Sequence, residues 1–162
     1  MKKNILIFAA VILNLVLLQG RLYAQNDTLV RKNNVYAELL GPAGVYSLNY
    51  ERILLSQGRW FNLAAGAGFS VYNNFTFDFP VRAVLLAGPK SHKLELGGGF
   101  EPEFYSNKEY GSSSQTIWFL KIGYRYHKKT GGPLLGFAIN PLFYPGTDWK
   151  QTWVSIDLGW NF

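Results

Sequence analysis

Eight stretches of this chain alternate, residue by residue, between large apolar side chains and small or polar ones. A period of two residues indicates a β-strand with two different faces, and no stretch shows a helical period. Turn-forming Gly, Pro, Asn and Ser residues separate the stretches. The expected strands are 34–41, 44–54, 60–72, 75–87, 92–105, 115–127, 133–144 and 150–162. The sequence therefore predicts an all-β fold, an antiparallel up-and-down barrel of eight strands.

The two faces of these strands differ in size, and this difference decides which face lies outside. One face carries Trp, Phe or Tyr on nearly every strand, whereas the other repeatedly carries glycine, as at Gly66, Gly97, Gly123 and Gly159. The interior of an eight-stranded barrel is only wide enough for side chains to fill it, so the aromatic face would overfill it. We therefore expect a transmembrane barrel with its aromatic face in lipid, rather than a lipocalin-like barrel with an apolar core.

This register turns the charged side chains of the strands towards the lumen. Because an unpaired charge in a narrow interior is costly, we expect these groups to neutralise one another and to plug the lumen. A slip of one residue in strand 92–105 would turn its charges into lipid, at about 2–4 kcal/mol for each basic residue. The expected lumenal charge network consists of Glu38, Glu51, Arg82, Lys93, Glu95, Lys121, Arg125 and Asp157.

The N-terminal segment has the features of a secretory signal. Lys2 and Lys3 precede an apolar stretch at 5–18, and Ala24 offers a small residue for cleavage. A membrane anchor is the alternative, since the apolar run is not far below spanning length. The polar residues that follow favour cleavage. We expect a signal peptide at 1–24, a short periplasmic segment at 25–33 and the outer-membrane barrel at 34–162.

Composition excludes several classes of function. The chain has no cysteine, which excludes a disulfide scaffold, a cysteine-linked lipid anchor and thiolate metal sites. Without Lys2, Lys3 and Arg21, 13 basic residues face 10 acidic ones, a net charge of +3. These basic residues are scattered or lie in turns, so we expect no nucleic-acid binding. Neither a cofactor nor a metal is expected.

An even number of strands places both ends of the barrel on the periplasmic side. The extracellular connections are then expected near 41–44, 73–74, 106–114 and 145–149, with the third the longest. Pro80, Pro102 and Pro141 fall inside expected strands, towards the extracellular half. Because proline cannot donate to a ladder, we expect bulges or an irregular outer rim there.

The last strand has apolar residues at every second position and ends in an aromatic residue, WVSIDLGWNF. This pattern resembles the terminal strand of outer-membrane barrels, which in that family is the signal read by the barrel-assembly machinery. The resemblance gives this role to Val154, Ile156, Leu158, Trp160 and Phe162. Further likeness to small, functionally uncharacterised outer-membrane barrels of the Bacteroidota lies in VYAELLGPAGVYSLNYERIL, HKLELGGG, IGYRYHKKTGG and AINPLF. Neither resemblance implies a catalytic or ligand-binding residue.

No constellation in the sequence points to catalysis. His92 and His127 fall at expected periplasmic turns, which favours a surface role. Outer-membrane lipid A deacylases resemble this size class and use a His and a Ser two residues apart, a pattern that is absent here. Glu101 and Glu103 share a face as glycosidase acids do, but we expect them to pair with interior Lys or Arg or to line the rim. The run 97–99 is Gly-Gly-Gly with no following Lys-Ser/Thr, which indicates packing rather than phosphate binding.

We therefore expect a monomeric, non-enzymatic outer-membrane protein with a structural role or a surface interaction through its outer rim. The polar segment 105–115 is long enough to contact an extracellular partner, which the sequence does not name. The expected partners are outer-membrane lipid and, during biogenesis, the barrel-assembly machinery. A lipid-modifying enzyme and a narrow channel remain the alternatives.

Overall fold

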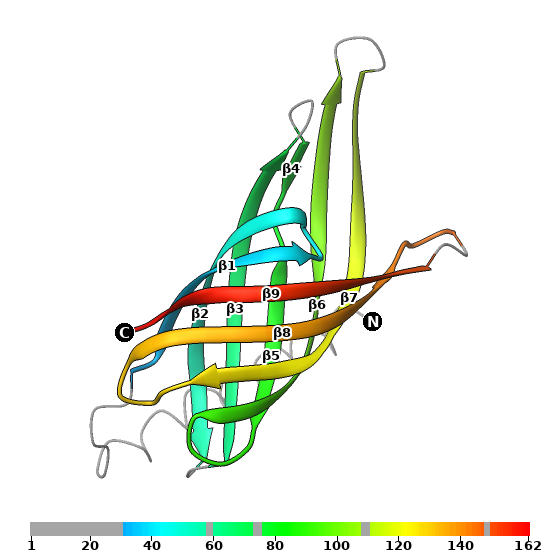
Figure 1. Cartoon of the computed structure of the whole chain (residues 1–162). Coiled ribbons are helices and arrows are strands. Elements are labelled where there is room, and N and C mark those ends of the chain that lie inside the picture. Colours follow the sequence, from blue (N-terminus) through cyan, green and yellow to red (C-terminus); the bar gives the residue numbers. More distant parts are fainter. Residues whose placement is uncertain (1–30, 58–59, 73–75, 108–110, 148–149) are drawn as a thin grey trace, which may run out of the picture. The chain divides into compact units, whose positions relative to one another are not determined.

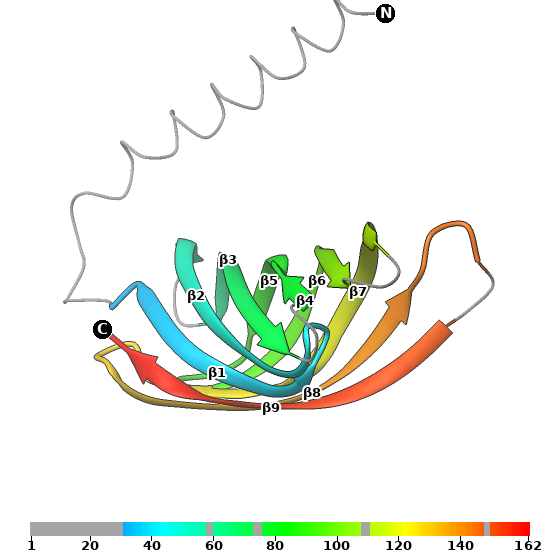
Figure 2. The same cartoon turned by 90° about the horizontal axis from the view of Figure 1, so that it is seen from above.

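Neighbouring strands hydrogen-bond around a closed ring in the computed structural model of this chain (Figures 1 and 2). The structure describes residues 31–57, 60–72, 76–107, 111–147 and 150–162, so the expected signal peptide and residues 25–30 lie outside the described part. The strands are β1 Asn33–Gly41, β2 Gly44–Gln57, β3 Phe61–Tyr72, β4 Thr76–Asp78, β5 Val81–Ala87, β6 His92–Asn107, β7 Gly111–His127, β8 Gly132–Phe143 and β9 Lys150–Asn161. Because β1 pairs with both β2 and β9, the sheet closes on itself.

Strands β4 and β5 together form one strand of the barrel. Both pair with β3 and with β6 in one continuous register, and only Phe79 and Pro80 lie between them. The backbone still bonds across this break, since Phe79 N donates to Pro102 O at 3.1 Å and Gly68 N donates to Pro80 O at 2.8 Å. The fold is thus the closed antiparallel up-and-down barrel of eight strands that the periodicity predicts. In the described part of the chain, no helix has the length and apolarity needed to cross a membrane.

The prolines disturb the ladders in a different way from the expected bulges. Pro80 separates β4 from β5, and the β7–β8 ladder skips the rungs beside Pro141, but the register is the same on both sides of each site. Pro102 lies in a continuous β6–β7 ladder. A proline removes a backbone N–H donor but adds no residue to the strand. The ladder therefore loses a pair of hydrogen-bonded residues, and the register between the two strands does not change. A register shift instead lies in β2–β3, between Ile53 and Leu55.

The expected long loop at 106–114 is mostly strand. Strand β6 continues to Asn107 and β7 begins at Gly111, with Ser106 opposite Ser112 in the ladder. The loop prediction was wrong because it followed the polar composition, whereas cross-strand pairing satisfies the backbone whatever the side chains. This hairpin rises beyond its neighbours (Figure 1).

The β1–β2 connection is a short turn that packs against the barrel mouth. Pro42 and Ala43 are buried, and Leu40 has a positive φ of 57° at the bend. The shortness of this connection was expected, but its burial was not. Because the turn is buried, it narrows the lumen at the end of the barrel away from Phe162.

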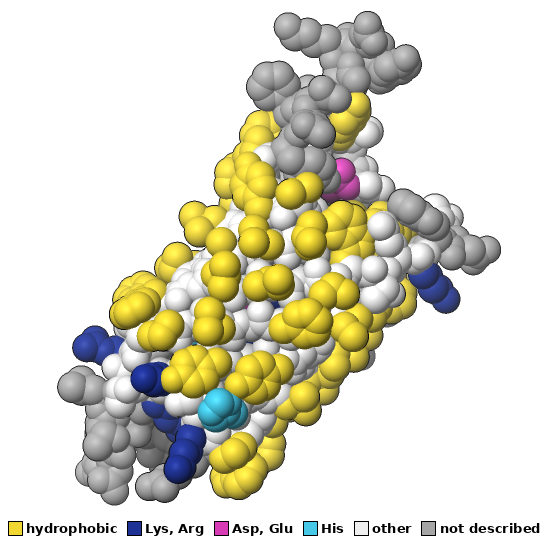
Figure 3. Space-filling view, in the orientation of Figure 1, with side chains coloured by type: hydrophobic (Ala, Val, Ile, Leu, Met, Phe, Trp, Pro, Cys, Tyr) yellow, Lys and Arg dark blue, Asp and Glu magenta, His cyan; other side chains and the backbone are white. Residues whose placement is uncertain are grey.

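The large apolar side chains lie on the outer face of the barrel and the charged side chains on the inner face, as expected from the narrow interior of an eight-stranded barrel. Leu96, Ile122 and Ile156 are 52%, 47% and 45% exposed, whereas Glu95 and Arg125, on neighbouring positions, are completely buried. Apolar side chains cover most of the visible surface, and Lys and Arg side chains gather at its lower end (Figure 3). Aromatic rings contact one another near both ends of β6: Phe69, Phe77, Phe79 and Phe104 at one end, and Tyr124 and Tyr126 with His92 at the other. This distribution is typical of a membrane barrel with aromatic girdles.

The small residues of the inner face make room for the lumenal side chains. A Cβ on Gly99 would overlap the backbone oxygen of Val81 and approach the Phe119 ring to 2.8 Å. Gly98 points outward, and a Cβ there would stay at least 3.1 Å from its nearest neighbours, Phe119 O and Leu120 Cδ2. Within the glycine run, close packing therefore requires glycine on the inner face, at Gly99, and not on the outer face, at Gly98.

Gly99→Val is expected to lower the free energy of unfolding by about 1–3 kcal/mol, because the added methyl groups overfill the lumen. Gly98→Val is the matched control, since it adds the same atoms on the outer face and is expected to change stability by less than about 0.5 kcal/mol. Urea unfolding of both variants, refolded in lipid vesicles, measures the difference. Equal losses in the two variants would contradict the assignment of the faces.

Candidate functional site

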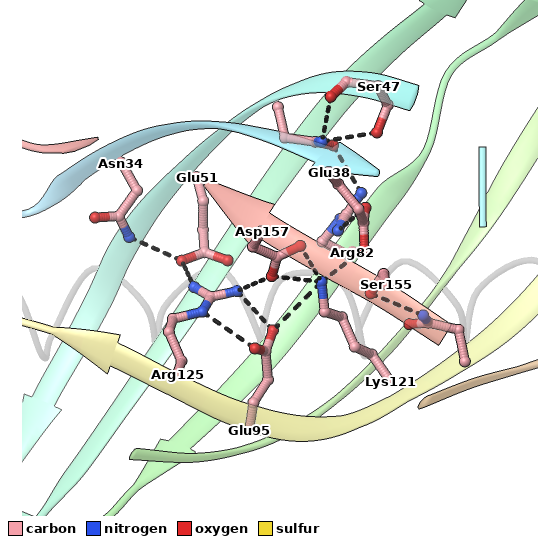
Figure 4. A network of polar contacts seen from close by, with 12 residues as sticks. Asn34, Glu38, Ser47, Glu51, Arg82, Glu95, Lys121, Arg125, Ser155 and Asp157 are labelled. Carbon is pink, nitrogen blue, oxygen red and sulfur yellow. Dashed lines mark hydrogen bonds and ion pairs between the residues drawn. The ribbon is translucent and has the colours of Figure 1, made fainter. Parts of the chain in front are cut away.

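Seven charged side chains meet inside the barrel and form a lumenal charge network (Figure 4). Each lies on an inward position of its strand, and each ion-paired side chain is no more than 1% exposed. The members are Glu38 of β1, Glu51 of β2, Arg82 of β5, Glu95 of β6, Lys121 and Arg125 of β7, and Asp157 of β9. Three cations and four carboxylates therefore occupy the space in which a pore would lie.

Lys121 lies between two carboxylates that face each other across the closing seam of the barrel. Glu38 and Asp157 are direct register partners in the β1–β9 pair. Two like charges in that position repel each other. The Lys121 ammonium is 2.7 Å from Glu38 Oε1 and 2.8 Å from Asp157 Oδ2, and Arg82 Nη1 binds Glu38 Oε2 at 2.8 Å. The Lys121 ammonium thus replaces the repulsion between Glu38 and Asp157 with an attraction of both carboxylates to one shared cation.

Arg125 joins two further carboxylates on opposite sides of the lumen. Its Nε and Nη2 donate to Glu95 at 3.1 and 2.6 Å, and its Nη1 donates to Glu51 Oε1 at 2.6 Å. Such forked, charge-assisted contacts are the strong class of hydrogen bond. Asn34 Nδ2 donates to Glu51 at 2.9 Å, and Asn161 Nδ2 donates to Asn34 Oδ1 at 2.8 Å. These hydrogen bonds connect the network to both β1 and β9, the first and last strands of the barrel.

The two histidines occupy different environments. His127 is completely buried, and its Nε2 accepts from Asn161 Nδ2, at the seam end of the network. The expected surface role is therefore wrong for His127. The inward positions of β7 recur at every second residue, as at Lys121 and Arg125, and this alternation continues to His127 at the end of the strand. His92 is exposed and contacts Tyr124 Oη.

Lys93 is the register partner of Arg125, and its side chain reaches carbonyl oxygens of the neighbouring turns. Its ammonium donates to Gly88 O at 2.5 Å and approaches Trp60 O at 3.5 Å, near the turns that precede β3 and β6. Parity placed Lys93 correctly on the inner face, where it is 1% exposed, but parity carries no information on height along the barrel. Its membership of the lumenal charge network therefore stays a prediction.

Tyr36 is a member of the site that the sequence argument missed. Its ring is 1% exposed and lies 5.4 Å from the Arg125 guanidinium carbon, 5.8 Å from that of Arg82 and 5.9 Å from Lys121 Nζ. An aromatic face at this distance stabilises a cation. The signal was present, since Tyr36 precedes Glu38 by two residues and so shares its inward parity. The expectation that large rings lie outside hid it.

A second acidic group lies nearer the rim of the barrel at the end away from Phe162. Asp78 and Glu103 are register partners in the β4–β6 pair, and Glu101 lies two residues from Glu103 on the same face. Among the ion pairs of the described residues, none involves these three carboxylates. Of the two alternatives expected for Glu101 and Glu103, pairing with interior Lys or Arg or a place at the rim, the place at the rim is the one observed. Glu103 accepts from Gln115 Nε2 at 2.5 Å.

Tyr144 follows β8 in the turn beside this acidic group. Burial, and after it the nearby carboxylates of Glu101 and Glu103, raises the pKa of the Tyr144 phenol above its ordinary value. The phenol therefore stays neutral beside the carboxylates at physiological pH. No three His, Cys, Asp or Glu side chains gather within the described ranges in a way that would hold a metal ion.

The inferred assembly signal lies wholly on the outer surface. Its five side chains are between 45% and 58% exposed and line one side of β9. They are Val154, Ile156, Leu158, Trp160 and Phe162. This placement leaves them accessible along the outer face of the last strand, and their role in assembly stays a prediction.

Comparison with known proteins identifies the fold. No protein-family model matches the chain, and no curated protein matches it in sequence. Solved structures similar to it include the crystal structure of the N-terminal β-barrel domain of Pseudomonas aeruginosa OprF, with a TM-score of 0.59 and 12% sequence identity. The match covers 81% of this chain and 96% of that domain. At this identity the likeness shows a shared architecture: this chain folds as an eight-stranded barrel of the outer-membrane type.

Proposed function

We propose that this protein is an integral outer-membrane barrel without enzymatic activity, closed to solutes, that serves as a structural component and presents its outer rim to a partner. The lumenal charge network carries the proposal, because its seven buried side chains occupy the only route through the barrel that the described strands enclose. The exposed apolar belt and the similar OprF domain support the outer-membrane location. Export through the signal peptide 1–24, the monomeric state and the likeness to Bacteroidota barrels belong to the same proposal.

Conductance distinguishes a plugged barrel from the channel alternative. The refolded protein is expected to leave a planar lipid bilayer silent, because moving an ion through the lumen would require breaking paired charges that are completely buried. Stepwise currents at neutral pH would overturn the plugged-lumen assignment and favour a narrow channel. The enzyme alternative is tested separately: overexpression in the host is expected to leave the lipid profile of the envelope unchanged.

The β6–β7 hairpin is the part of the rim that best fits a protein contact. Strand β7 pairs with β8 only from Trp118 onwards, so the backbone edge of 111–117 has no partner in β8. The side chains of Ser112, Ser113 and Ser114 are exposed along it. Unpaired strand edges accept an added strand from another chain, and polar side chains keep such an edge soluble until then.

A shortened hairpin tests this surface. Phe104 and Ser114 are register partners, so replacing 105–113 by Asn-Gly closes the hairpin with a two-residue turn and spares the barrel. We expect this variant to insert normally but to lose the extracellular proteins that co-purify with the parent after cross-linking. Ser113→Ala, which keeps the backbone edge, is the control and should retain them. An identical set of co-purifying proteins from all three forms would contradict the interaction role.

A further inference from the structure

A cavity of about 330 Å³ opens above the lumenal charge network, on the side away from Phe162. The buried β1–β2 turn forms one wall with Pro42 and Gly44, and strands β6 to β9 form the others. A cavity of this size is at the lower end of the range for small-molecule sites. It has room for a compact ligand and not for a polymer.

Part of the acidic wall of this cavity lacks hydrogen-bond partners. Glu101 lines the cavity and is 2% exposed, yet its Oε2 has no hydrogen-bond partner. Asp78, completely buried and opposite Glu103 in the ladder, has no partner for either carboxylate oxygen. A buried carboxylate without a partner is costly by several kcal/mol. Burial without a partner therefore disfavours the ionised form of these carboxyl groups, and a bound cation would stabilise that form.

The other walls are apolar and aromatic. Ile117 and Leu142 pack together under the cavity, and Tyr144 and Trp153 lie against them. The Trp153 indole nitrogen is a buried donor without a hydrogen-bond partner, and it is the second such polar group at this cavity, after Glu101. Aromatic rings beside carboxylates form the kind of environment that binds organic cations.

The geometry points to a binding site for a small organic cation, an ammonium or guanidinium group attached to an apolar body, in the cavity between Glu101 and Trp153. The cationic group binds the Glu101 carboxylate through charge-assisted hydrogen bonds, and its apolar part packs on Ile117, Leu142 and the Trp153 ring. A metal ion is the weaker fit, because the described residues offer no cluster of three ligating side chains. This site goes beyond the structural role proposed above and does not depend on the hairpin surface.

Isothermal titration calorimetry of the protein refolded in detergent tests the site with phenethylammonium as the probe. Uncharged 2-phenylethanol, of nearly the same shape, is the control ligand. We expect phenethylammonium to bind at least about tenfold more tightly, and Glu101→Gln to weaken its binding by about tenfold or more. Equal affinity for the two ligands, no detectable heat, or undiminished affinity in a folded Glu101→Gln variant would each overturn the proposal.

A tryptophan pair keeps the test decisive if Glu101→Gln fails to fold, as judged by heat-modifiable migration on gels. Trp153→Phe removes the indole from the cavity and is expected to weaken phenethylammonium binding by roughly 3- to 30-fold. Trp118→Phe makes the same change on the outer face, where Trp118 is 53% exposed, and should leave binding unchanged. Identical affinities in the two variants would contradict the cavity as the site, and would leave the barrel's structural role unaffected.

Discussion

Lys121→Met is expected to lower the free energy of unfolding by about 3–5 kcal/mol, because it leaves buried carboxylates without their cation. Lys121 binds both Glu38 and Asp157, which face each other across the β1–β9 seam. Without the ammonium, the seam that closes the barrel contains two like charges side by side. Urea unfolding in lipid vesicles measures the loss, and we expect the seam to be the first part to open.

Two controls separate this electrostatic effect from lost packing. Lys150→Met removes an exposed lysine at the start of β9 and should change stability by less than about 0.5 kcal/mol. Adding Glu38→Gln to Lys121→Met removes one of the two like charges that face each other across the seam. Part of the loss is expected to return, even though the ion pair of Glu38 with Arg82 is lost. If Lys121→Met alone were as stable as the parent, the network would have no role in closing the barrel.

Leu96→Arg is expected to be the most damaging change on the outer surface, with a cost of about 2–4 kcal/mol. Leu96 is paired with Ile122 on one side and Leu85 on the other and is 52% exposed, so the arginine would lie in hydrocarbon. Ser113→Arg places the same group on an exposed position of the hairpin and serves as the control. Folding yield and urea unfolding in vesicles report the cost. A small and equal effect of both changes would show that Leu96 lies in water.

The inward and outward faces were predictable because a strand has a strict period of two and the two environments are opposite. Glu95 and Arg125 are buried while Leu96 and Ile122 are exposed, as parity requires. Parity does not report height, because the stagger of the strands around the ring decides which inward residues meet at one level. For this reason the grouping of Asp78 with Glu101 and Glu103 was not anticipated.

Composition was a weaker guide than parity. The polar run around Ser112 and Ser113 reads as a loop, yet its backbone continues the β6–β7 ladder. The preference for rings outside held for most of the surface and failed at Tyr36, where the charges of the lumen favour an aromatic neighbour. The cavity beside Glu101 arises from the buried β1–β2 turn, a tertiary contact that no local pattern in the sequence encodes.

Everything proposed for this protein depends on bulky apolar side chains contacting lipid around a lumen filled by charge. The chain has no native cysteine, so single cysteines at Leu96, Ile122 and Ile156 can each carry a nitroxide spin label without background. Power saturation in lipid vesicles then measures the access of oxygen, which concentrates in hydrocarbon, and of a water-soluble nickel complex. We predict high oxygen access and low nickel access at all three positions. Ready access of the nickel complex at these sites, or exclusion of both reagents as in a closed protein core, would contradict the account.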